Sequence, residues 1–448
     1  MKTGRWYYPL IALPLAAISG VLLALALPPN DISAIGWIAF IPLLIVSRIT
    51  RPLIATGCAF IAALTCGRML TGPVTTDAQL GNSIAAFGGL GLVLAFAVGV
   101  SAFGSRRMPA AVWAVFVACA GVSAEFLARS IFPVSLAISQ YQTAGALRVA
   151  SFTGIWGVTF LLWLFPASLV ALCTSRRAWP VFTVSLLLTL LVVFLPFPKP
   201  SGTKTIQVAA IQAQDQWSAS DITDKIASHT QIVVWPEYLL DHKSPVPVNA
   251  ARHNRVYIVA DIIEPTGGRK LYNAAILISP KGKRLAAFRK QHLFGKEQFE
   301  FTKGRSSRAV KCDKFTAGAP VCFDSEFTDV IRAQVRSGAN IILIPNHDPE
   351  TPNCTFNYLH LAAIPFRAAE NGVPIAWAES NGLSSVIDST GRILSRAPIH
   401  SATAARAHVH LRHRSTFFTL AGDYFAWICV ATTFVLLTLS VLRKRTSG

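Results

Sequence analysis

Charged residues are scarce in this chain. Only 14% of its 448 residues are Asp, Glu, Lys or Arg, against about a quarter in ordinary soluble domains. Acidic residues are the scarcer kind, since 22 Asp and Glu stand against 41 Lys and Arg and leave a net charge of +19. The shortage is greatest in residues 1–198, where long apolar runs replace the charge. The composition therefore indicates a membrane part, a polar part and a last apolar segment, rather than one soluble domain.

Metal-ligand and disulfide patterns are also missing. The eight cysteines stand apart at positions 58, 66, 119, 173, 312, 322, 354 and 429, and no pair has CxxC or metal-ligand spacing. We therefore expect no metal and no organic cofactor. A disulfide between Cys312 and Cys354 stays open if the polar part lies in an oxidising compartment, with Cys322 left as a free thiol.

The positive net charge comes without a nucleic-acid-binding motif. No block of Lys and Arg is longer than three residues, and no basic stripe is interleaved with aromatic residues. We therefore expect no direct contact with nucleic acid. Part of the excess lies in short loops between apolar runs, where it orients membrane spans. The excess in the polar part suits anionic lipid headgroups.

Eight apolar runs reach or approach the roughly 20 residues that a membrane-spanning helix needs. They cover residues 10–27, 33–49, 53–70, 84–104, 109–128, 152–173, 179–197 and 424–442. The first run lacks a convincing small-residue cleavage site and is followed by Pro28 and Pro29, so we interpret it as a retained helix rather than a signal peptide. We expect eight spans. The alternative is that one short run is a re-entrant or core helix.

Basic residues alternate between the loops that join these runs. Lys and Arg lie at positions 2 and 5, 48 and 51, 106 and 107, 176 and 177, and 443–445, whereas loops 28–32 and 71–83 contain neither. Because cytoplasmic loops are enriched in Lys and Arg, the alternation predicts that both termini are cytoplasmic. It places residues 198–423 outside the cytoplasm. Glu125 and Arg129, four residues apart, are expected to pair at a helix end.

Short β-rich runs and helical stretches follow each other in the polar part. The β-rich runs are residues 206–211, 232–235, 256–260, 274–278 and 341–344, and helices are expected at 327–337 and 359–371. The alternation predicts an α/β domain, and strands that are apolar throughout indicate a sheet covered on both faces. We therefore expect a membrane domain at 1–198, an α/β domain at 199–423 after a stiff linker at 196–202, and an eighth span with a basic tail at 424–448.

Three stretches of the polar part contain residues that could form a site with a nucleophilic cysteine. Cys322 follows the small-residue turn 318–321, so we expect its thiol to project from a sharp turn at a strand end. Glu237 ends the apolar run Val-Val-Trp-Pro and is the candidate base. Lys290 can stabilise both a thiolate and an oxyanion. Each residue alone is more often a core cysteine or a surface charge, so the three count only together.

Three further residues are candidate supporting groups. Asp324 can hold the Cys322 loop by accepting a backbone N–H, and His292 flanks Lys290. Glu297 is either a second carboxylate near the site or a surface residue. A thiolate in such a site would attack an ester or amide carbonyl and form a thioester, which water or an amine would then resolve.

The three stretches resemble the Glu, Lys and Cys signatures of the nitrilase, or carbon–nitrogen hydrolase, superfamily, in its order. With Leu25-Ala-Leu-Pro-Pro29, Gly154-Ile-Trp-Gly157 and Arg367-Ala-Ala-Glu370-Asn371-Gly372, the chain resembles bacterial apolipoprotein N-acyltransferases over nearly its full length. The resemblance implies a multi-pass protein of the bacterial inner membrane: an eight-span helical domain with an inserted periplasmic nitrilase-like α/β sandwich. It also implies Glu237 as base, Lys290 as oxyanion stabiliser and Cys322 as nucleophile, moving an acyl group from a phospholipid to the amine of a lipoprotein.

Some residues depart from that family. After Leu293 the chain has Phe294-Gly-Lys-Glu297, whereas the family has Val-Pro-Phe-Gly-Glu. Residues 345–349 lack both aromatic residues of the family's Asn-Asp-x-Trp-Phe-Gly run. Asp324 stands where the family has a Glu. These loops frame the entrance for the substrate, so the identity of the acyl acceptor is left undecided. If the acceptor is water, the enzyme is an amidase-type hydrolase. The chain also resembles the shortened TraB proteins of plasmid conjugal transfer. That would imply another amide or ester substrate, such as a secreted peptide or pilin, or a non-catalytic role.

Overall fold

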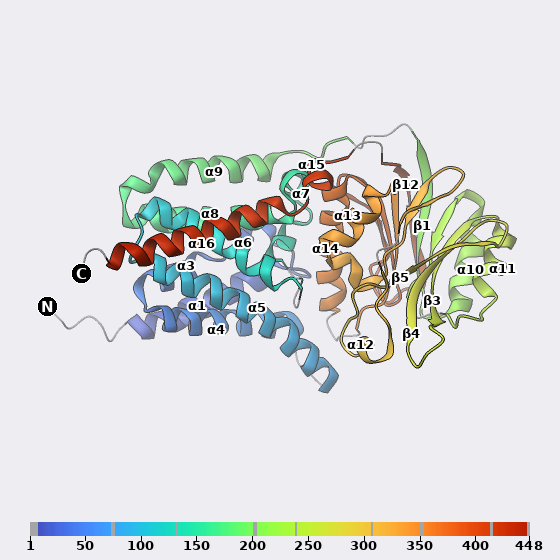
Figure 1. Ribbon diagram of the computed structural model, residues 1–448, viewed down its shortest axis with the longest axis horizontal. Helices are drawn as coiled ribbons and strands as arrows, with labels where there is room; N and C mark the ends of the chain where they lie inside the picture. The colour runs from blue at the N-terminus through green and yellow to red at the C-terminus, as the bar shows by residue number, and fades with distance from the viewer. Residues whose placement is uncertain are drawn as a thin grey trace. The chain divides into compact units, whose positions relative to one another are not determined.

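The structure is a computed structural model, and it describes residues 8–72, 77–130, 133, 135–199, 204–237, 240–305, 308–349, 354–412 and 415–445. Lys2, Arg5 and part of the linker at 196–202 lie outside the described residues. The chain divides into two compact units (Figure 1). The first comprises residues 1–196, 351–355 and 423–448, and the second comprises residues 197–350 and 356–422.

The first unit is helical. Its helices are α1 (Tyr8–Ala26), α2 (Ser33–Gly36), α3 (Ile41–Ile49), α4 (Pro52–Thr71), α5 (Asp77–Gly104), α6 (Ala110–Ala128), α7 (Ala144–Thr153), α8 (Ile155–Thr174), α9 (Trp179–Phe194) and α16 (Tyr424–Arg445), with 3-10 turns η1 (Leu136–Gln140) and η2 (Arg176–Ala178). Among the described residues, six helices are long and apolar enough to cross a membrane: α4, α5, α6, α8, α9 and α16. The unit therefore belongs to a multi-pass membrane protein, while the count of eight spans stays a prediction.

The apolar run at 33–49 does not form one continuous helix. It breaks into α2 and α3 around a turn at residues 37–40. Pro42 lies in the first turn of α3, where proline is tolerated because the missing N–H would have no helical partner there. Phe40 in the break stacks on Trp163 of α8 with ring centroids 3.9 Å apart, and both rings are buried. Packing against α8 therefore holds this run as a broken helix.

Loops that are alternate in sequence contact each other in the first unit. The α5–α6 connection meets the α3–α4 connection, because Arg106 donates to the carbonyl oxygen of Thr50 at 2.5 Å. Loop 28–32, which has no Lys or Arg, meets the connection at 129–151, because Asp31 accepts from the Tyr141 hydroxyl at 3.1 Å and Ser33 O accepts from Gln140 at 2.7 Å. Loops that are alternate in sequence are thus neighbours in space.

The expected pair between Glu125 and Arg129 is wrong. Glu125 is buried and its Oε2 accepts hydrogen bonds from the hydroxyls of Ser135 at 2.6 Å and Thr159 at 3.2 Å. Arg129 instead donates to the carbonyl oxygen of Phe126 and lies 3.6 Å from the centre of that ring. A buried carboxylate needs hydrogen-bond donors, and two neighbouring segments supply them.

The second unit is a sandwich of two six-stranded sheets. Their strand orders are β12-β1-β2-β3-β4-β5 and β11-β10-β9-β8-β7-β6. The strands are β1 (Thr205–Gln212), β2 (Ile232–Val234), β3 (Tyr257–Pro265), β4 (Leu271–Ile278), β5 (Arg284–Arg289), β6 (Val310–Lys311), β7 (Thr316–Gly318), β8 (Ile341–Asn346), β9 (Ile375–Glu379), β10 (Ser385–Ile387), β11 (Ile393–Arg396) and β12 (Thr403–His410). β1, β2 and β3 are parallel, as are β7, β8 and β9, and the outer strands are antiparallel.

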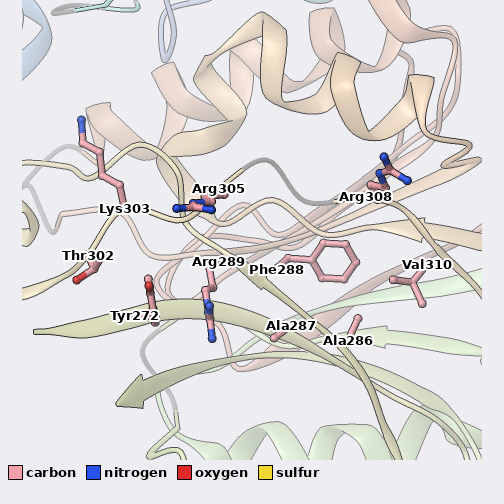
Figure 2. Close-up of a pocket in the computed structure, with 10 residues that line it drawn as sticks. All are labelled: Tyr272, Ala286, Ala287, Phe288, Arg289, Thr302, Lys303, Arg305, Arg308 and Val310. Atoms are coloured by element: carbon pink, nitrogen blue, oxygen red, sulfur yellow. The ribbon is translucent and has the colours of Figure 1, made fainter. Parts of the chain in front are cut away.

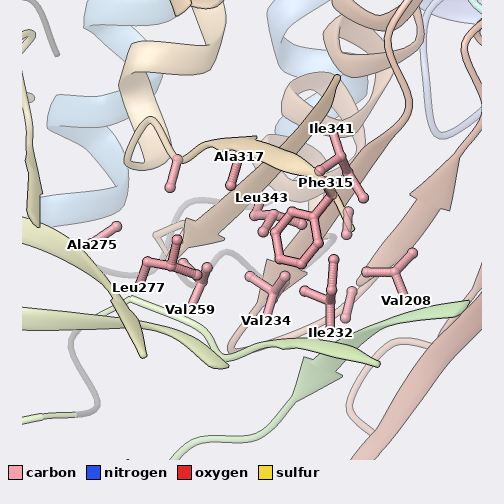
Figure 3. Packing of buried hydrophobic residues seen from close by; sticks show 14 of the residues in the cluster. Val208, Ile232, Val234, Val259, Ala275, Leu277, Phe315, Ala317, Ile341 and Leu343 are labelled. Carbon is pink, nitrogen blue, oxygen red and sulfur yellow. The ribbon is translucent and has the colours of Figure 1, made fainter. Parts of the chain in front are cut away.

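Helices cover the outer faces of both sheets. In Figure 1, α10 (Gln216–Ile226) and α11 (Val246–Asn254) lie beside the first sheet, and α13 (Thr328–Arg336) and α14 (Thr355–Asn371) beside the second. The shorter elements are η3 (Ala227–His229), α12 (Glu297–Glu300), η4 (Cys322–Glu326) and α15 (Phe417–Ala421). Between the sheets, Val234, Val259 and Leu277 meet Phe315 and Leu343 in one apolar core (Figure 3).

This architecture confirms the predicted α/β domain. The five β-rich runs form β1, β2, β3, β4 and β8, and the two expected helices form α13 and α14. The central strands are buried on both faces because one face meets the other sheet and the other face meets helices. The carboxyl ends of β2 and β8 come together, since Glu237 N donates to Asn346 O at 3.2 Å. Side chains that follow these strand ends can therefore share one site.

Candidate active site

Two of the three predicted catalytic side chains are in direct contact. Lys290, which follows β5, donates from Nζ to Oε1 of Glu237 at 2.8 Å and to Oε1 of Glu297 at 2.9 Å. Lys290 and Glu237 are each 1% exposed. Burial opposes the charge on Lys290, but Cys322 and Glu237 outweigh it and raise the pKa of the ammonium. Lys290 is therefore a cation at neutral pH, fixed between two carboxylates.

The shortened loop after Leu293 still brings Glu297 to the site. Gly295 adopts a φ of +54°, in the left-handed region that glycine enters at little cost, so the chain can turn within few residues. Glu297 Oε2 then accepts from the backbone N–H of Phe294 at 2.8 Å, which ties the loop to its own carboxylate. Burial and the nearby charge of Glu237 raise the pKa of Glu297 to about 8.

Cys322 stands at a strained turn beside these groups. It is the first residue of η4, four residues beyond the end of β7, and its φ is +45°, which a residue with a Cβ rarely adopts. Its thiol is buried and donates to the carbonyl oxygen of His347 at 3.8 Å. Burial and the charge of Glu237 raise the pKa of the thiol, and Lys290 opposes that rise. Cys322 at rest is therefore a thiol, which would need a base before it could act as a nucleophile.

The predicted supporting residue Asp324 connects the two loops of the site. Its carboxylate accepts the backbone N–H groups of Gln291 at 3.1 Å and His292 at 2.8 Å, just after Lys290. It also lies 3.1 Å from Nδ1 of His292, whose ring stacks on Phe327. One buried carboxylate two residues from Cys322 thereby fixes the backbone that carries Lys290. The catalytic roles of Glu237, Lys290 and Cys322 stay predictions.

Sequence reasoning missed Asn273 of β4. Its Nδ2 donates to Oε1 of Glu237 at 2.7 Å and lies 3.4 Å from Oε1 of Glu297. It therefore bridges the two carboxylates beside Lys290. Asn273 is buried within an otherwise apolar strand. A polar residue in such a run was the available signal, because buried polar groups need partners.

A second group that sequence reasoning missed lies behind the nucleophile. His360 of α14 contacts Asp348 Oδ1 through Nδ1 at 2.7 Å and the Ser325 hydroxyl through Nε2 at 2.8 Å. Ser325 donates to the carbonyl oxygen of Cys322 at 2.7 Å. Asp348 lies after β8, and its backbone N–H donates to Glu379 at 3.1 Å. Local sequence offered no signal for this chain of contacts, because its members are far apart in sequence.

Two expectations from the sequence concern a disulfide and a metal. Cys312 is a free thiol, so the disulfide with Cys354 that the sequence left open is not formed. Among the described residues, no group of three His, Cys, Asp or Glu side chains could hold a metal ion.

Family models match both units of the chain. Residues 19–169 match the apolipoprotein N-acyltransferase N-terminal domain, and residues 248–412 match the carbon-nitrogen hydrolase family. The second match contains Lys290 and Cys322 but begins after Glu237. The two matches therefore fall on opposite sides of the boundary between the helical unit and the sandwich.

Known proteins match between a third and nearly all of the chain. An apolipoprotein N-acyltransferase from Geobacter metallireducens is 29% identical and aligns with 96% of this chain and 95% of its own length. The apolipoprotein N-acyltransferase of Thermotoga maritima is 24% identical over 69% of this chain and 65% of its own. An (R)-stereoselective amidase from a Pseudomonas species is 31% identical over 34% of this chain and 56% of its own.

Solved structures match about half of the chain. An amidase from Nesterenkonia is 21% identical, covers 45% of this chain and 89% of its own, and has a TM-score of 0.39. A carbon-nitrogen hydrolase from Helicobacter pylori is 17% identical, covers 46% and 89%, and has a TM-score of 0.40. The family models and the curated relatives thus describe a membrane protein that is similar in both of its units to the apolipoprotein N-acyltransferases and, in residues 248–412, to the carbon-nitrogen hydrolases.

Proposed function

We propose that this chain is a cysteine acyltransferase of the membrane, which moves an acyl group from a phospholipid through a Cys322 thioester to the amine of a lipoprotein. The observation that carries the proposal is the contact of buried Lys290 with two carboxylates beside the thiol of Cys322. The match of both units to N-acyltransferases supports the same reaction. The conjugal-transfer alternative has no better support from the relatives.

The two oxygens of Glu237 have separate tasks in this proposal. Oε1 is held by Lys290 and Asn273, whereas Oε2 is buried and has no hydrogen-bond partner among the described residues. Oε2 can therefore accept the Cys322 proton as the sulfur attacks the ester carbonyl. The oxyanion that forms is stabilised by the ammonium of Lys290. Glu237 returns the proton to the departing lysophospholipid oxygen, which leaves a thioester.

The second half-reaction uses the same groups in reverse. The acceptor amine attacks the thioester carbonyl, Lys290 again stabilises the oxyanion, and Glu237 accepts a proton from the nitrogen. The C–S bond breaks, and the sulfur regains the proton from Glu237. The products are an amide and the free thiol, so neither redox chemistry nor a cofactor is needed.

Exposed aromatic rings beside the site suit a lipid substrate. Phe294 and Phe299 flank Glu297 and are 45% and 73% exposed. Exposed apolar groups that form one patch mark binding surfaces, and an acyl chain is a matching ligand. Phe294 also contacts Phe323, the neighbour of Cys322, with ring centroids 5.0 Å apart. The aromatic surface therefore continues to the residue next to the nucleophile.

The alternating loop charges support a periplasmic α/β domain with cytoplasmic termini. The gathering of basic loops at Thr50 and Arg106 is what a single cytoplasmic side requires. Alkaline phosphatase is active only outside the cytoplasm, so fusions test the proposal. We expect high activity for a fusion after Lys204 and low activity for one after Arg107. Equal activities would contradict the orientation.

Trapping the intermediate tests the reaction itself. The purified full chain is incubated with a phospholipid that carries a labelled acyl group, and Cys322 peptides are measured by mass spectrometry. We expect an acyl mass on Cys322 that disappears in Cys322→Ala and transfers to a diacylated lipopeptide amine. Loss of the acyl group to water at the same rate, with or without the lipopeptide, would identify a hydrolase instead. Restoration of triacylated lipoproteins in cells that lack their own N-acyltransferase would show the acceptor.

A further inference from the structure

A cationic groove lies at one edge of the second unit, and none of the three proposed catalytic residues lines it. Its walls come from β4, from β5, and from the connection that leads to β6 (Figure 2). Its volume is about 760 Å³, which is enough for a lipid headgroup together with the start of its acyl chains.

Four cationic side chains surround the groove. They are Arg289, Lys303, Arg305 and Arg308, all exposed, and none of the described residues that line the groove is acidic. The surrounding stretch 281–314 has eleven Lys and Arg and three Asp and Glu, so it alone contributes eleven minus three, or +8, to the net charge. Arg289 also pairs with Glu264, 3.5 Å away. The positive charges that line the groove repel each other, and an anion in the groove would relieve that repulsion.

Apolar surface underlies these cations. Ala286 and Val310 line the groove and also pack against the core between the two sheets, and Phe288 belongs to that core. Figure 2 shows the Phe288 ring among the groove side chains. At this edge the inter-sheet core reaches the surface beneath the arginines. A groove with a cationic rim and an apolar floor suits an amphiphile whose anion is joined to hydrocarbon.

Two other polyanionic ligands fit this groove less well. Single-stranded nucleic acid binds by stacking bases on exposed aromatic rings, but the Tyr272 ring is covered by the guanidinium of Arg289 at 4.0 Å. An acidic peptide could add a strand to an open sheet edge. Here, however, the end of β5 is already covered, because Gly304 donates to the carbonyl oxygen of Lys290 at 2.7 Å.

We propose that this groove binds the phosphate of an anionic phospholipid as a ligand that is not consumed. Arg305 and Arg308 face the phosphate from the connection and Arg289 from β5, and guanidinium groups bind phosphate oxygens in pairs. Ala286 and Val310 contact the glycerol and the first methylene groups. Binding does not need the thiol, so the proposal does not rest on the acyltransferase reaction.

Native mass spectrometry of the detergent-purified full chain tests the proposal. All chains carry Cys322→Ala, so that no bound lipid is turned over. Phosphatidylglycerol and phosphatidylcholine with identical acyl chains are titrated into the parent, into Arg305→Gln/Arg308→Gln, and into the matched control Arg396→Gln/Arg406→Gln. The control pair removes two exposed arginines from β11 and β12 of the same unit.

We expect the parent and the control to bind the first phosphatidylglycerol more tightly than phosphatidylcholine. In Arg305→Gln/Arg308→Gln the affinity for phosphatidylglycerol should fall about tenfold, since each basic residue near a headgroup contributes on the order of a few-fold. An equal loss in the control pair would overturn the proposal. So would displacement by glycerol phosphate at an equal concentration, which would show a plain anion site, or displacement by an oligothymidine, which would show a nucleic-acid site.

Discussion

His360 and Ser325 are joined by a 2.8 Å hydrogen bond whose direction can be deduced. The Ser325 hydroxyl gives its hydrogen to the carbonyl oxygen of Cys322, so its oxygen accepts from Nε2 of His360. The carboxylate of Asp348 also accepts, from Nδ1. Both ring nitrogens therefore carry hydrogen, and His360 is an imidazolium. A buried cation thus holds the backbone turn in which Cys322 has a φ of +45°.

The first prediction concerns His360 as a positioning residue. In His360→Gln the Ser325 hydroxyl and the Asp348 carboxylate lose a shared cationic donor, so acyl transfer should fall at least about tenfold through kcat, with a smaller change in KM. Ser325→Ala should show the same split, because it breaks the same chain of contacts at the next link. Exposed His408 of β12 serves as the control, and His408→Gln should be silent. A purely structural role for His360 would instead lower the amount of folded protein and leave kcat unchanged.

The same residue predicts how stability depends on pH. Burial opposes the charge on His360, but Asp348 outweighs burial and raises the pKa to about 9, with Glu326 and Glu379 acting in the same direction. Because the folded pKa lies above the ordinary value of about 6.5, this contribution is complete below pH 6.5 and is lost as pH rises through 9. The melting temperature of the parent should therefore decline over that range. In His360→Gln this part of the decline should be absent.

The second prediction concerns the charge balance around Lys290. In Lys290→Met the buried carboxylate of Glu237 loses its cation, which should cost about 3–5 kcal/mol of stability. Adding Glu237→Gln removes that charge and should restore part of the stability, while acyl transfer stays lost. Thermal unfolding of the detergent-solubilised chain measures the first effect, with exposed Lys281→Met as control. Additive losses in the double variant would contradict this balance.

The third prediction concerns the proton on Glu297. Burial and the charge of Glu237 raise its pKa to about 8, so the folded chain keeps this carboxyl neutral where the unfolded chain ionises it. Stability from this group is therefore complete below about pH 4.5 and falls as pH rises to 8. Glu297→Gln should flatten the melting temperature between these limits, and exposed Glu300→Gln should not. A parallel pH profile for Glu297→Gln and the parent would contradict the assignment.

The fourth prediction separates two effects of Glu237 on the nucleophile. Burial raises the pKa of the Cys322 thiol, and the charge of Glu237 raises it further. In the parent, iodoacetamide at neutral pH should therefore modify exposed Cys173 before Cys322. Glu237→Gln removes the opposing charge, so alkylation of Cys322 should become faster while acyl transfer falls by about 10²–10⁴ for lack of a base. The rate of alkylation is measured by peptide mass spectrometry. Slower alkylation in Glu237→Gln would contradict the prediction, because it would show that Glu237 activates the thiol as a base more than its negative charge disfavours the thiolate.

Five apolar strands were predictable from the sequence, whereas β9 within the second sheet and the outer strand β12 were not predicted. The β-rich runs that became β2 and β8 are apolar enough to be buried in any arrangement. β12, by contrast, reads Thr-Ala-Ala-Arg-Ala-His-Val-His, and its residues are mostly weak strand formers. It is a strand because it pairs along its whole length with β1, from Thr205 with His410 to Gln212 with Thr403. Such a partner, nearly two hundred residues away, cannot be inferred from local composition.

The site divides in the same way. Local pattern did not single out Glu237, Lys290 or Cys322 alone, and the three became candidates only together, through their resemblance to a known family. Whether Glu297 reaches Lys290 depended on a turn at Gly295. His360 comes from α14 and Asp348 from the loop after β8, and no local spacing indicates that contact.

The sequence by itself determined the membrane part and several apolar strands, and it predicted the residues for thioester chemistry, because burial and reactivity depend largely on residue types and their near neighbours. Only the tertiary structure decided that the run at 33–49 breaks and that Glu125 turns inward. It also decided that the imidazolium of His360 supports the turn at Cys322, and that four cations share one groove. Those outcomes depend on which distant segment supplies the hydrogen-bond donor, the ring or the opposing charge. Packing makes that choice, and a one-dimensional pattern does not contain it.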